Sequence, residues 1–148
     1  MDGNSPRPPV STPLLPVLTP AGRLRLAAEV LATYGEVRWR MRRGDLRETT
    51  RALRSRTDEG QWAEPAVETY WQAVRLAKAV KRTLALLPTD SRCLMQSLVL
   101  TGMLSRRGIS SVLVVAVSPG PEFKAHAWVE HGGGHLLPRG EFGRLLEL

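Results

Sequence analysis

The sequence predicts an α+β protein in which N-terminal helices lead to a cysteine-bearing helix packed on a small antiparallel sheet. Three observations carry this prediction. Apolar residues recur at helical spacing through the first two thirds of the chain. A continuous apolar run then covers residues 112–117, and an alternating run covers residues 125–130. Turn residues separate these runs, and the order of helices first and strands last is typical of the α+β class.

The composition fits one globular domain. The 148 residues, 43% of them apolar, are enough for one core and too few for two ordinary domains. A single cysteine excludes an internal disulfide and a cysteine-based zinc cage, and it fits a reducing compartment. The start lacks the features of a secretory signal, and no apolar run approaches the ~18 residues that span a bilayer. We therefore expect a cytoplasmic protein that does not bind membranes.

The chain is expected to begin with an arm and a helical segment. Six prolines among the first 20 residues predict an extended arm over residues 1–18. Thr19 has the form of an N-cap before a proline, and the helix that it opens is expected to end at Gly44. A short helix capped by Asp45 completes the segment of residues 19–60.

Residues 19–60 are strongly basic. Ten arginines lie between Arg23 and Arg56, with Trp39 among them, and the net charge of the chain is +7. Such a charge allows an acidic partner, but no known nucleic-acid-binding signature accompanies it, so nucleic acid is not expected. Two interpretations remain. The segment forms a docking face for a peptide or protein, or most of its individual arginines are plain solvated surface.

Two further helices are expected before the strands. The third helix keeps an apolar stripe over residues 67–87, with Tyr70 and Trp71 at core spacing. Asp90 then caps a helix that ends at Gly108, where a left-handed residue is expected. Arg106 and Arg107 precede this glycine, and their positive charges suit the negative C-terminal end of the helix dipole.

Three strands are expected after this helix. They cover residues 111–117, 125–130 and 135–137, and a glycine turn over residues 132–134 joins the last two. The third strand is expected at an edge because Pro138 follows it and cannot donate to a neighbour. Residues 142–148 are expected to form only a closing turn.

The only cysteine, Cys93, lies in the first turn of the expected fourth helix. There the unpaired backbone N–H groups and the helix dipole favour a thiolate, and the same N–H groups can hold an oxyanion. Arg92 favours the thiolate by its charge, whereas Asp90 opposes it. The alternative is a buried cysteine that acts as a small hydrophobic residue.

A histidine in the second strand can complete a nucleophile. His126, Trp128 and Glu130 share one face of the strand, and His126 can take the proton of Cys93 if that face meets the helix. The alternative is an ordinary histidine. His131 and His135 flank the glycine turn and are expected to be exposed, without forming a metal site.

A third group is needed to orient the imidazole. The hairpin is expected to bring residues 138–141 back beside His126, which makes Glu141 the favoured carboxylate. Glu130 is less favoured because same-face neighbours along one strand lie roughly 7–13 Å apart. The candidate catalytic residues are therefore Cys93, His126 and Glu141, and the candidate substrate-binding residues are Arg92 and Trp128. No metal or cofactor is expected.

The contexts of the cysteine and the histidine resemble one family. Three stretches carry the resemblance: Ser91-Arg92-Cys93-Leu94, the step into a strand at Arg106-Arg107-Gly108-Ile109, and Phe123-Lys124-Ala125-His126-Ala127-Trp128-Val129-Glu130. Together they resemble the lasso-peptide leader peptidases, also described as microcin-processing or transglutaminase-like proteases, over roughly residues 63–148. The histidine block is shared more widely with transglutaminase-like proteins.

This resemblance implies a papain-like cysteine protease core over residues 61–148. Such proteins remove the leader of a ribosomally made precursor, and a separate ATP-dependent cyclase then closes the freed amine onto an Asp or Glu side chain. The implied partners are the precursor, a small leader-recognition protein and the cyclase. The family usually has an aspartate about a dozen residues after the histidine, where this chain has Pro138. The third residue therefore stays open between Glu141 and a Cys–His dyad.

Two other functions are compatible with the same residues. A transglutaminase-like acyl transferase would form the same thioester at Cys93 and pass it to an amine. A non-catalytic module would bind peptides with a vestigial site. The basic segment, including Arg40, Arg42 and Arg43, is our candidate for docking the leader or its carrier protein.

Overall fold

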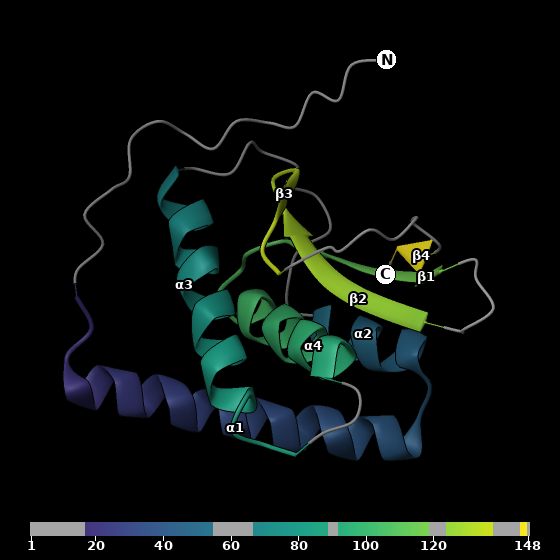
Figure 1. The fold of residues 1–148 in the computed structure, drawn as a ribbon, viewed down its shortest axis with the longest axis horizontal. Coiled ribbons are helices and arrows are strands. Elements are labelled where there is room, and N and C mark those ends of the chain that lie inside the picture. The colour runs from purple at the N-terminus through teal and green to yellow at the C-terminus, as the bar shows by residue number, and fades with distance from the viewer. Residues whose placement is uncertain (1–16, 55–66, 89–91, 119–123, 138–145, 148) are drawn as a thin grey trace.

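The computed structural model describes residues 17–54, 67–88, 92–118, 124–137 and 146–147 (Figure 1). Within these ranges the chain forms helices and then strands, which confirms the predicted α+β order. The elements are α1 (Pro20–Arg43), α2 (Leu46–Arg54), α3 (Val67–Leu84), α4 (Arg92–Ser105), β1 (Val112–Ser118), β2 (Lys124–His131), β3 (Gly134–His135) and β4 (Leu146–Glu147). No helix in these ranges has the length and apolar character that a bilayer crossing requires.

Helix α1 begins and ends where the sequence predicts, and α2 begins after its predicted cap. The hydroxyl of Thr19 accepts a hydrogen bond from the backbone N–H of Gly22 at 3.1 Å, which makes it the N-cap of α1. The helix ends at Gly44, and the carboxylate of Asp45 accepts from the N–H of Glu48 at 2.7 Å to cap α2. Most of the predicted N-terminal arm, residues 1–16, lies outside the described residues.

Helix α3 ends earlier than its apolar stripe predicts. It stops at Leu84, and the next residues form a tighter turn in which Leu87 N donates to Leu84 O at 3.1 Å. Tyr70 and Trp71 are half-buried and meet edge to face, with ring centroids 5.6 Å apart. Their predicted packing role is confirmed.

Helix α4 lies at the centre of the molecule. It contacts α1, α2, α3 and β2, and from Ser97 to Ser105 its residues are all buried. Its C-terminal end is closed by two bonds, from Gly108 N to Ser105 O at 3.0 Å and from Ile109 N to Leu104 O at 3.0 Å. Gly108 has a φ of +68°, as predicted for the residue that ends this helix.

Helices α1 and α2 share one core with α4. Val30, Val37 and Leu53 are buried in the same apolar cluster as the residues of α4. The approach is closest at Gly102, where an added Cβ would lie 3.2 Å from Leu53 and 3.3 Å from Thr33. The division between residues 60 and 61 falls in a range outside the described residues, so it stays a prediction.

The strands form one antiparallel sheet in the order β3-β2-β1-β4. The central pair places Ala116 opposite His126 and Val114 opposite Trp128. Gly132 and Gly133 connect β2 to β3 with φ values of +57° and +76°, a two-residue turn that glycine adopts readily. Strand β3 lies at the sheet edge, as predicted.

Strand β4 corrects the prediction that the end of the chain forms only a turn. Leu146 pairs with Val115 and Glu147 pairs with Val114, so this short segment adds an edge strand beside β1. The predicted third strand is also shorter than expected: β3 covers only residues 134–135, although Leu136 N still donates to Val129 O at 2.9 Å.

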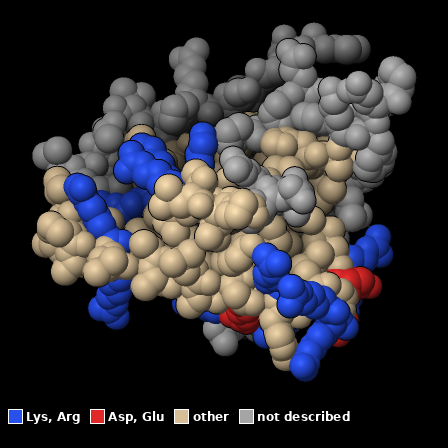
Figure 2. All heavy atoms as spheres, turned by 60° about the horizontal axis from the view of Figure 1, so that its bottom comes forward, with Lys and Arg blue, Asp and Glu red and all other residues tan. Residues whose placement is uncertain are grey.

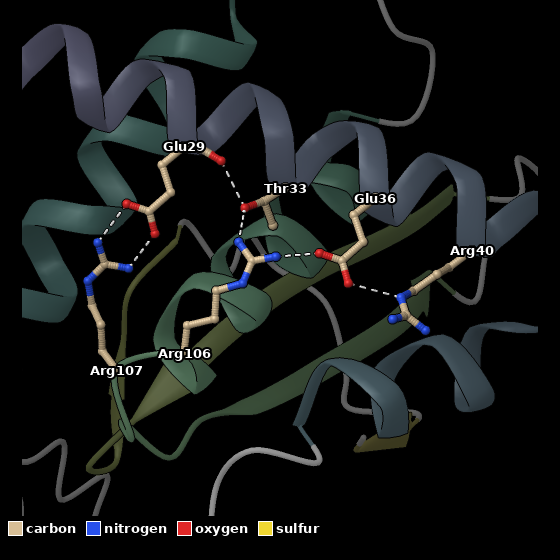
Figure 3. Close-up of polar contacts among 6 residues, drawn as sticks. All are labelled: Glu29, Thr33, Glu36, Arg40, Arg106 and Arg107. Atoms are coloured by element: carbon tan, nitrogen blue, oxygen red, sulfur yellow. Dashed lines mark hydrogen bonds and ion pairs between the residues drawn. The ribbon is translucent and has the colours of Figure 1, made fainter.

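Two arginines after α4 fasten it to α1 (Figure 3). Arg107 donates to both carboxylate oxygens of Glu29, at 2.7 and 2.8 Å. Arg106 donates to the hydroxyl of Thr33 at 2.6 Å and to the carboxylate of Glu36. The sequence predicted only that these cations suit the end of a helix. The structure shows that they hold two helices together.

Candidate functional site

The candidate site is built on one face of strand β2. His126, Trp128 and Glu130 alternate along the strand and therefore point to the same side of the sheet. Trp128 is fully buried, and the imidazole of His126 stacks on its indole with ring centroids 6.0 Å apart and planes 28° apart. His126 itself is half-buried. The indole thus supports one side of the candidate base.

Glu130 holds this indole in place. Its Oε1 atom accepts a hydrogen bond from Nε1 of Trp128 at 2.8 Å and lies 3.2 Å from Nδ1 of His135 on β3. The side chain of Glu130 is only 14% exposed. A buried indole N–H without an acceptor is costly, so this carboxylate fixes the ring under His126. The sequence placed Glu130 on the correct face but did not predict this bond.

Cys93 lies where the sequence predicts, in the first turn of α4. The residue is half-buried. Helix α4 packs on β2, and the first turn of α4 lies at the same end of the molecule as the start of β2 (Figure 1). The two candidate catalytic residues are the second residue of α4 and the third residue of β2. Cys93 and His126 therefore lie near the beginnings of α4 and β2, two elements that contact each other.

The other predicted site residues are described in part. Arg92 is the first residue of α4, but its side chain is outside the described part of the structure. Glu141 and the candidate cap Asp90 also lie outside the described residues. Their roles stay predictions. The described residues contain no cluster of His, Cys, Asp and Glu that could hold a metal ion.

The prediction for His131 is wrong. This histidine is buried, with 6% of its surface exposed, and its Nδ1 lies 2.6 Å from the carbonyl oxygen of Ser110. It therefore ties the end of β2 to the segment before β1. His135, by contrast, is exposed as predicted. Alternation puts His131 on the opposite face of β2 from His126, which the sequence pattern already contained.

The main electrostatic feature lies at the other end of α4. The hydrogen bonds from Arg107, opposed by partial burial, hold the pKa of Glu29 below its usual value. The same hydrogen bond to Glu29 raises the pKa of Arg107. Both groups therefore stay charged at neutral pH, as a strong bidentate pair requires.

A thiol at the start of a buried helix and an imidazole supported on a neighbouring strand suit acyl chemistry through a thioester. Neither the comparison with curated proteins nor that with solved structures found a match. The sequence does match the family model of the transglutaminase-like superfamily over residues 30–142, which includes α4, β1, β2 and most of α1. The chain therefore belongs to the transglutaminase-like superfamily.

Proposed function

We propose that the protein is a cysteine endopeptidase that removes the leader from a lasso-peptide precursor, which frees the core N-terminus for ring closure by a separate cyclase. The observation that carries the proposal is the position of the only cysteine, Cys93, in the first turn of a helix that packs on the strand of His126. Superfamily membership supports cysteine-dependent protease or acyl-transfer chemistry. The residues around Cys93 and His126 support the narrower assignment by their resemblance to the leader peptidases.

In the proposed reaction, Sγ of Cys93 attacks the carbonyl carbon of the leader–core bond as a thiolate. Backbone N–H groups of the first turn of α4 stabilise the oxyanion. His126 gives its proton to the leaving amine, which becomes the N-terminus of the core. Water then attacks the thioester while His126 takes a proton from it, and the leader leaves with a free carboxylate. Glu141 orients the imidazole, or the pair works as a dyad.

Trp128 is the proposed support for the base. Its indole is buried and bonded to Glu130, so it offers the imidazole of His126 a fixed surface. A stacked ring limits the rotation of the imidazole. This gives Trp128 a positioning role.

The proposed partners are a small leader-recognition protein, the precursor that it delivers and the cyclase. Lys and Arg gather in two groups toward the two ends of the face that carries α1 (Figure 2). In the group at the end of α1, Arg42 is exposed and the guanidinium of Arg43 lies 4.2 Å from the ring centre of Trp39. An exposed aromatic ring among cations suits an acidic peptide or protein surface.

Replacement of Cys93 by alanine tests the proposal. With the precursor and the recognition protein present, we expect Cys93→Ala to lower the cleavage rate at least ~10³-fold, because the nucleophile is lost. Mass spectrometry of the released leader and core measures this rate. The exposed Lys78→Ala variant, on α3, is the matched control and should cleave normally. Equal cleavage by Cys93→Ala and wild type would refute the proposal.

Acyl transfer is the second candidate function, since the superfamily supports it as well as hydrolysis. The two differ only in what attacks the thioester. Cleavage in the presence of a primary amine separates them, because transfer leaves the amine on the leader carboxyl group and hydrolysis does not. Labelling of Cys93 by iodoacetamide near neutral pH tests the non-catalytic module, which predicts an unreactive thiol.

A further inference from the structure

A cavity of about 340 Å³ lies between helices α1 and α3, beside the segment that follows α4. One face of α1 and one face of α3 supply most of its walls, at positions spaced three and four residues apart. The lining residues are Leu18, Gly22, Arg25, Leu26, Glu29, Gln72, Arg75, Leu76 and Arg107. The volume lies in the range of ligand sites, roughly 300–1,000 Å³.

The lining combines an apolar part with a positive part. Leu18, Leu26 and Leu76 supply the apolar part, and Leu76 is almost fully buried. Three arginines face a single carboxylate, and that carboxylate, Glu29, already accepts two hydrogen bonds from Arg107. Arg25, at the exposed side, adds a further positive charge to the lining. Such a lining is complementary to an apolar group that carries a negative charge beside it.

We propose that this cavity is an exosite for the peptide substrate, and that it binds a large apolar side chain next to an acidic one. The inference rests on the proposed peptidase function. The apolar side chain enters between Leu26 and Leu76, and the carboxylate pairs with Arg25 at the exposed side. Gln72 carries both a donor and an acceptor, as contact with a peptide backbone requires. A second copy of this chain is disfavoured as the occupant, because its net charge is +7.

The position of the exosite sets a minimum length for the substrate. Helix α4 has 14 residues, so it is about 20 Å long. Cys93 lies in its first turn, and Arg107 lies just beyond its last residue. An extended peptide covers at most ~3.6 Å per residue. At least six residues must therefore separate the apolar–acidic pair from the bond that is cut.

Binding to the Cys93→Ala protein tests the exosite without any need for catalysis. The probe is a fluorescein-labelled Gly/Ser peptide that contains one Leu-Glu pair, followed by fluorescence anisotropy at low ionic strength. We expect Arg25→Glu to weaken binding at least fivefold. Arg23→Glu is the matched control: Arg23 is also exposed in the first turns of α1 but does not line the cavity, so it should change binding less than twofold. Added salt should weaken binding of the peptide to the Cys93→Ala protein in which Arg25 is unchanged.

A second probe keeps the test independent of any effect of mutation on folding. The same peptide with Leu-Lys in place of Leu-Glu should bind at least fivefold more weakly to the Cys93→Ala protein. Equal binding of the two peptides, or equal effects of Arg25→Glu and Arg23→Glu, would overturn the exosite. Competition by octanoate as strong as that by the unlabelled Leu-Glu peptide would overturn the peptide as its ligand.

Cleavage by the wild-type protein then tests the spacing. Peptides with eight residues between the Leu-Glu pair and the cut bond should have a KM several-fold lower than peptides with two. An equal KM would contradict the path from exosite to Cys93. Binding without any cleavage would refute the peptidase proposal and leave the binding site standing, so the two failures are distinguishable.

Discussion

Glu29 and Arg107 form the best-defined ion pair among the described residues. The guanidinium meets the carboxylate in bidentate geometry, and both side chains are less than a third exposed. We expect Glu29→Gln to lower the free energy of unfolding at pH 7 by about 1 kcal/mol, near the upper end for pairs that solvent still screens. Urea unfolding followed by circular dichroism measures the change. Glu48→Gln, an exposed position on α2, is the control and should change stability by only a few tenths of a kcal/mol.

The same pair makes a prediction for pH. The pKa of Glu29 is lower in the folded protein than in the unfolded chain, so its contribution is fully present above the unfolded value of about 4.3 and is lost as the pH falls through the folded value. Arg107 keeps its charge throughout this range. The stability gap between wild type and Glu29→Gln should therefore stay constant down to about pH 5 and close below it. A gap of constant size down to pH 3 would contradict this assignment.

Two substitutions of Glu130 distinguish the effect of its hydrogen bond to Trp128 from the effect of its charge. We expect Glu130→Ala to lower stability by roughly 1–3 kcal/mol, since the buried N–H of Trp128 loses its acceptor. Cleavage should fall as well, because the indole supports His126. Glu130→Gln keeps an oxygen acceptor and should restore most of the stability and activity. Thermal unfolding and the kcat for precursor cleavage are the measurements. Equal losses in both variants would mean that the charge, rather than the hydrogen bond, matters.

The candidate site shows what local sequence can and cannot predict about residues. Alternation along a strand placed His126, Trp128 and Glu130 on one face, since that pattern depends only on the backbone. The bond from Trp128 to Glu130 depends on side-chain rotamers, and the contact with His135 depends on the register of β3. Alternation also places His131 on the opposite face from His126, but its burial against Ser110 O depends on a residue that is distant in sequence. Such tertiary contacts leave no local pattern.

At the scale of elements, ends defined by capping residues were predicted well. Thr19, Asp45 and Gly108 each satisfy backbone groups within a few residues of themselves, so the local sequence determines the result. The end of α3 and the strand β4 were not predicted. The apolar stripe of α3 runs on to Leu87, which still packs against the core from the turn after the helix, although Leu86 beside it is exposed. Strand β4 is two residues long and forms only through its pairing with β1.

Two helical glycines predict opposite effects of an added side chain. Gly102 lies where α4 meets α1 and α2. The side chain of Gly102→Val should push Leu53 and Thr33 away from α4 and lower the free energy of unfolding by about 1–3 kcal/mol. Gly35 is exposed on α1, and an added Cβ there meets nothing within 4 Å. Gly35→Ala should therefore stabilise the protein by about 0.5–1 kcal/mol. Urea unfolding measures both changes. Destabilisation of similar size in the two variants would contradict the close packing at Gly102.

At the scale of the whole molecule, the basic first half is also part of the core. Its arginines predicted a docking segment, and that role stays a prediction. Its apolar residues Val30, Val37 and Leu53, however, pack in the cluster that contains α4. Arg106 and Arg107 add polar bonds between the same parts (Figure 3). The helix that presents Cys93 is thus held by both halves of the sequence.

This arrangement predicts that residues 61–148 do not fold alone. Without α1 and α2, α4 would lose the residues that pack on Gly102, and Arg106 and Arg107 would lose their acceptors. We expect the fragment to bind the dye ANS and to unfold without a cooperative transition, whereas the full chain unfolds in one step. Calorimetry and ANS fluorescence provide the comparison. Addition of residues 1–60 as a separate chain should restore cooperativity if packing against α1 and α2 is what is missing. A fragment with a sharp transition near that of the full chain would instead show that the sheet and α3 suffice to fix α4, and the first half would then be free to serve docking alone.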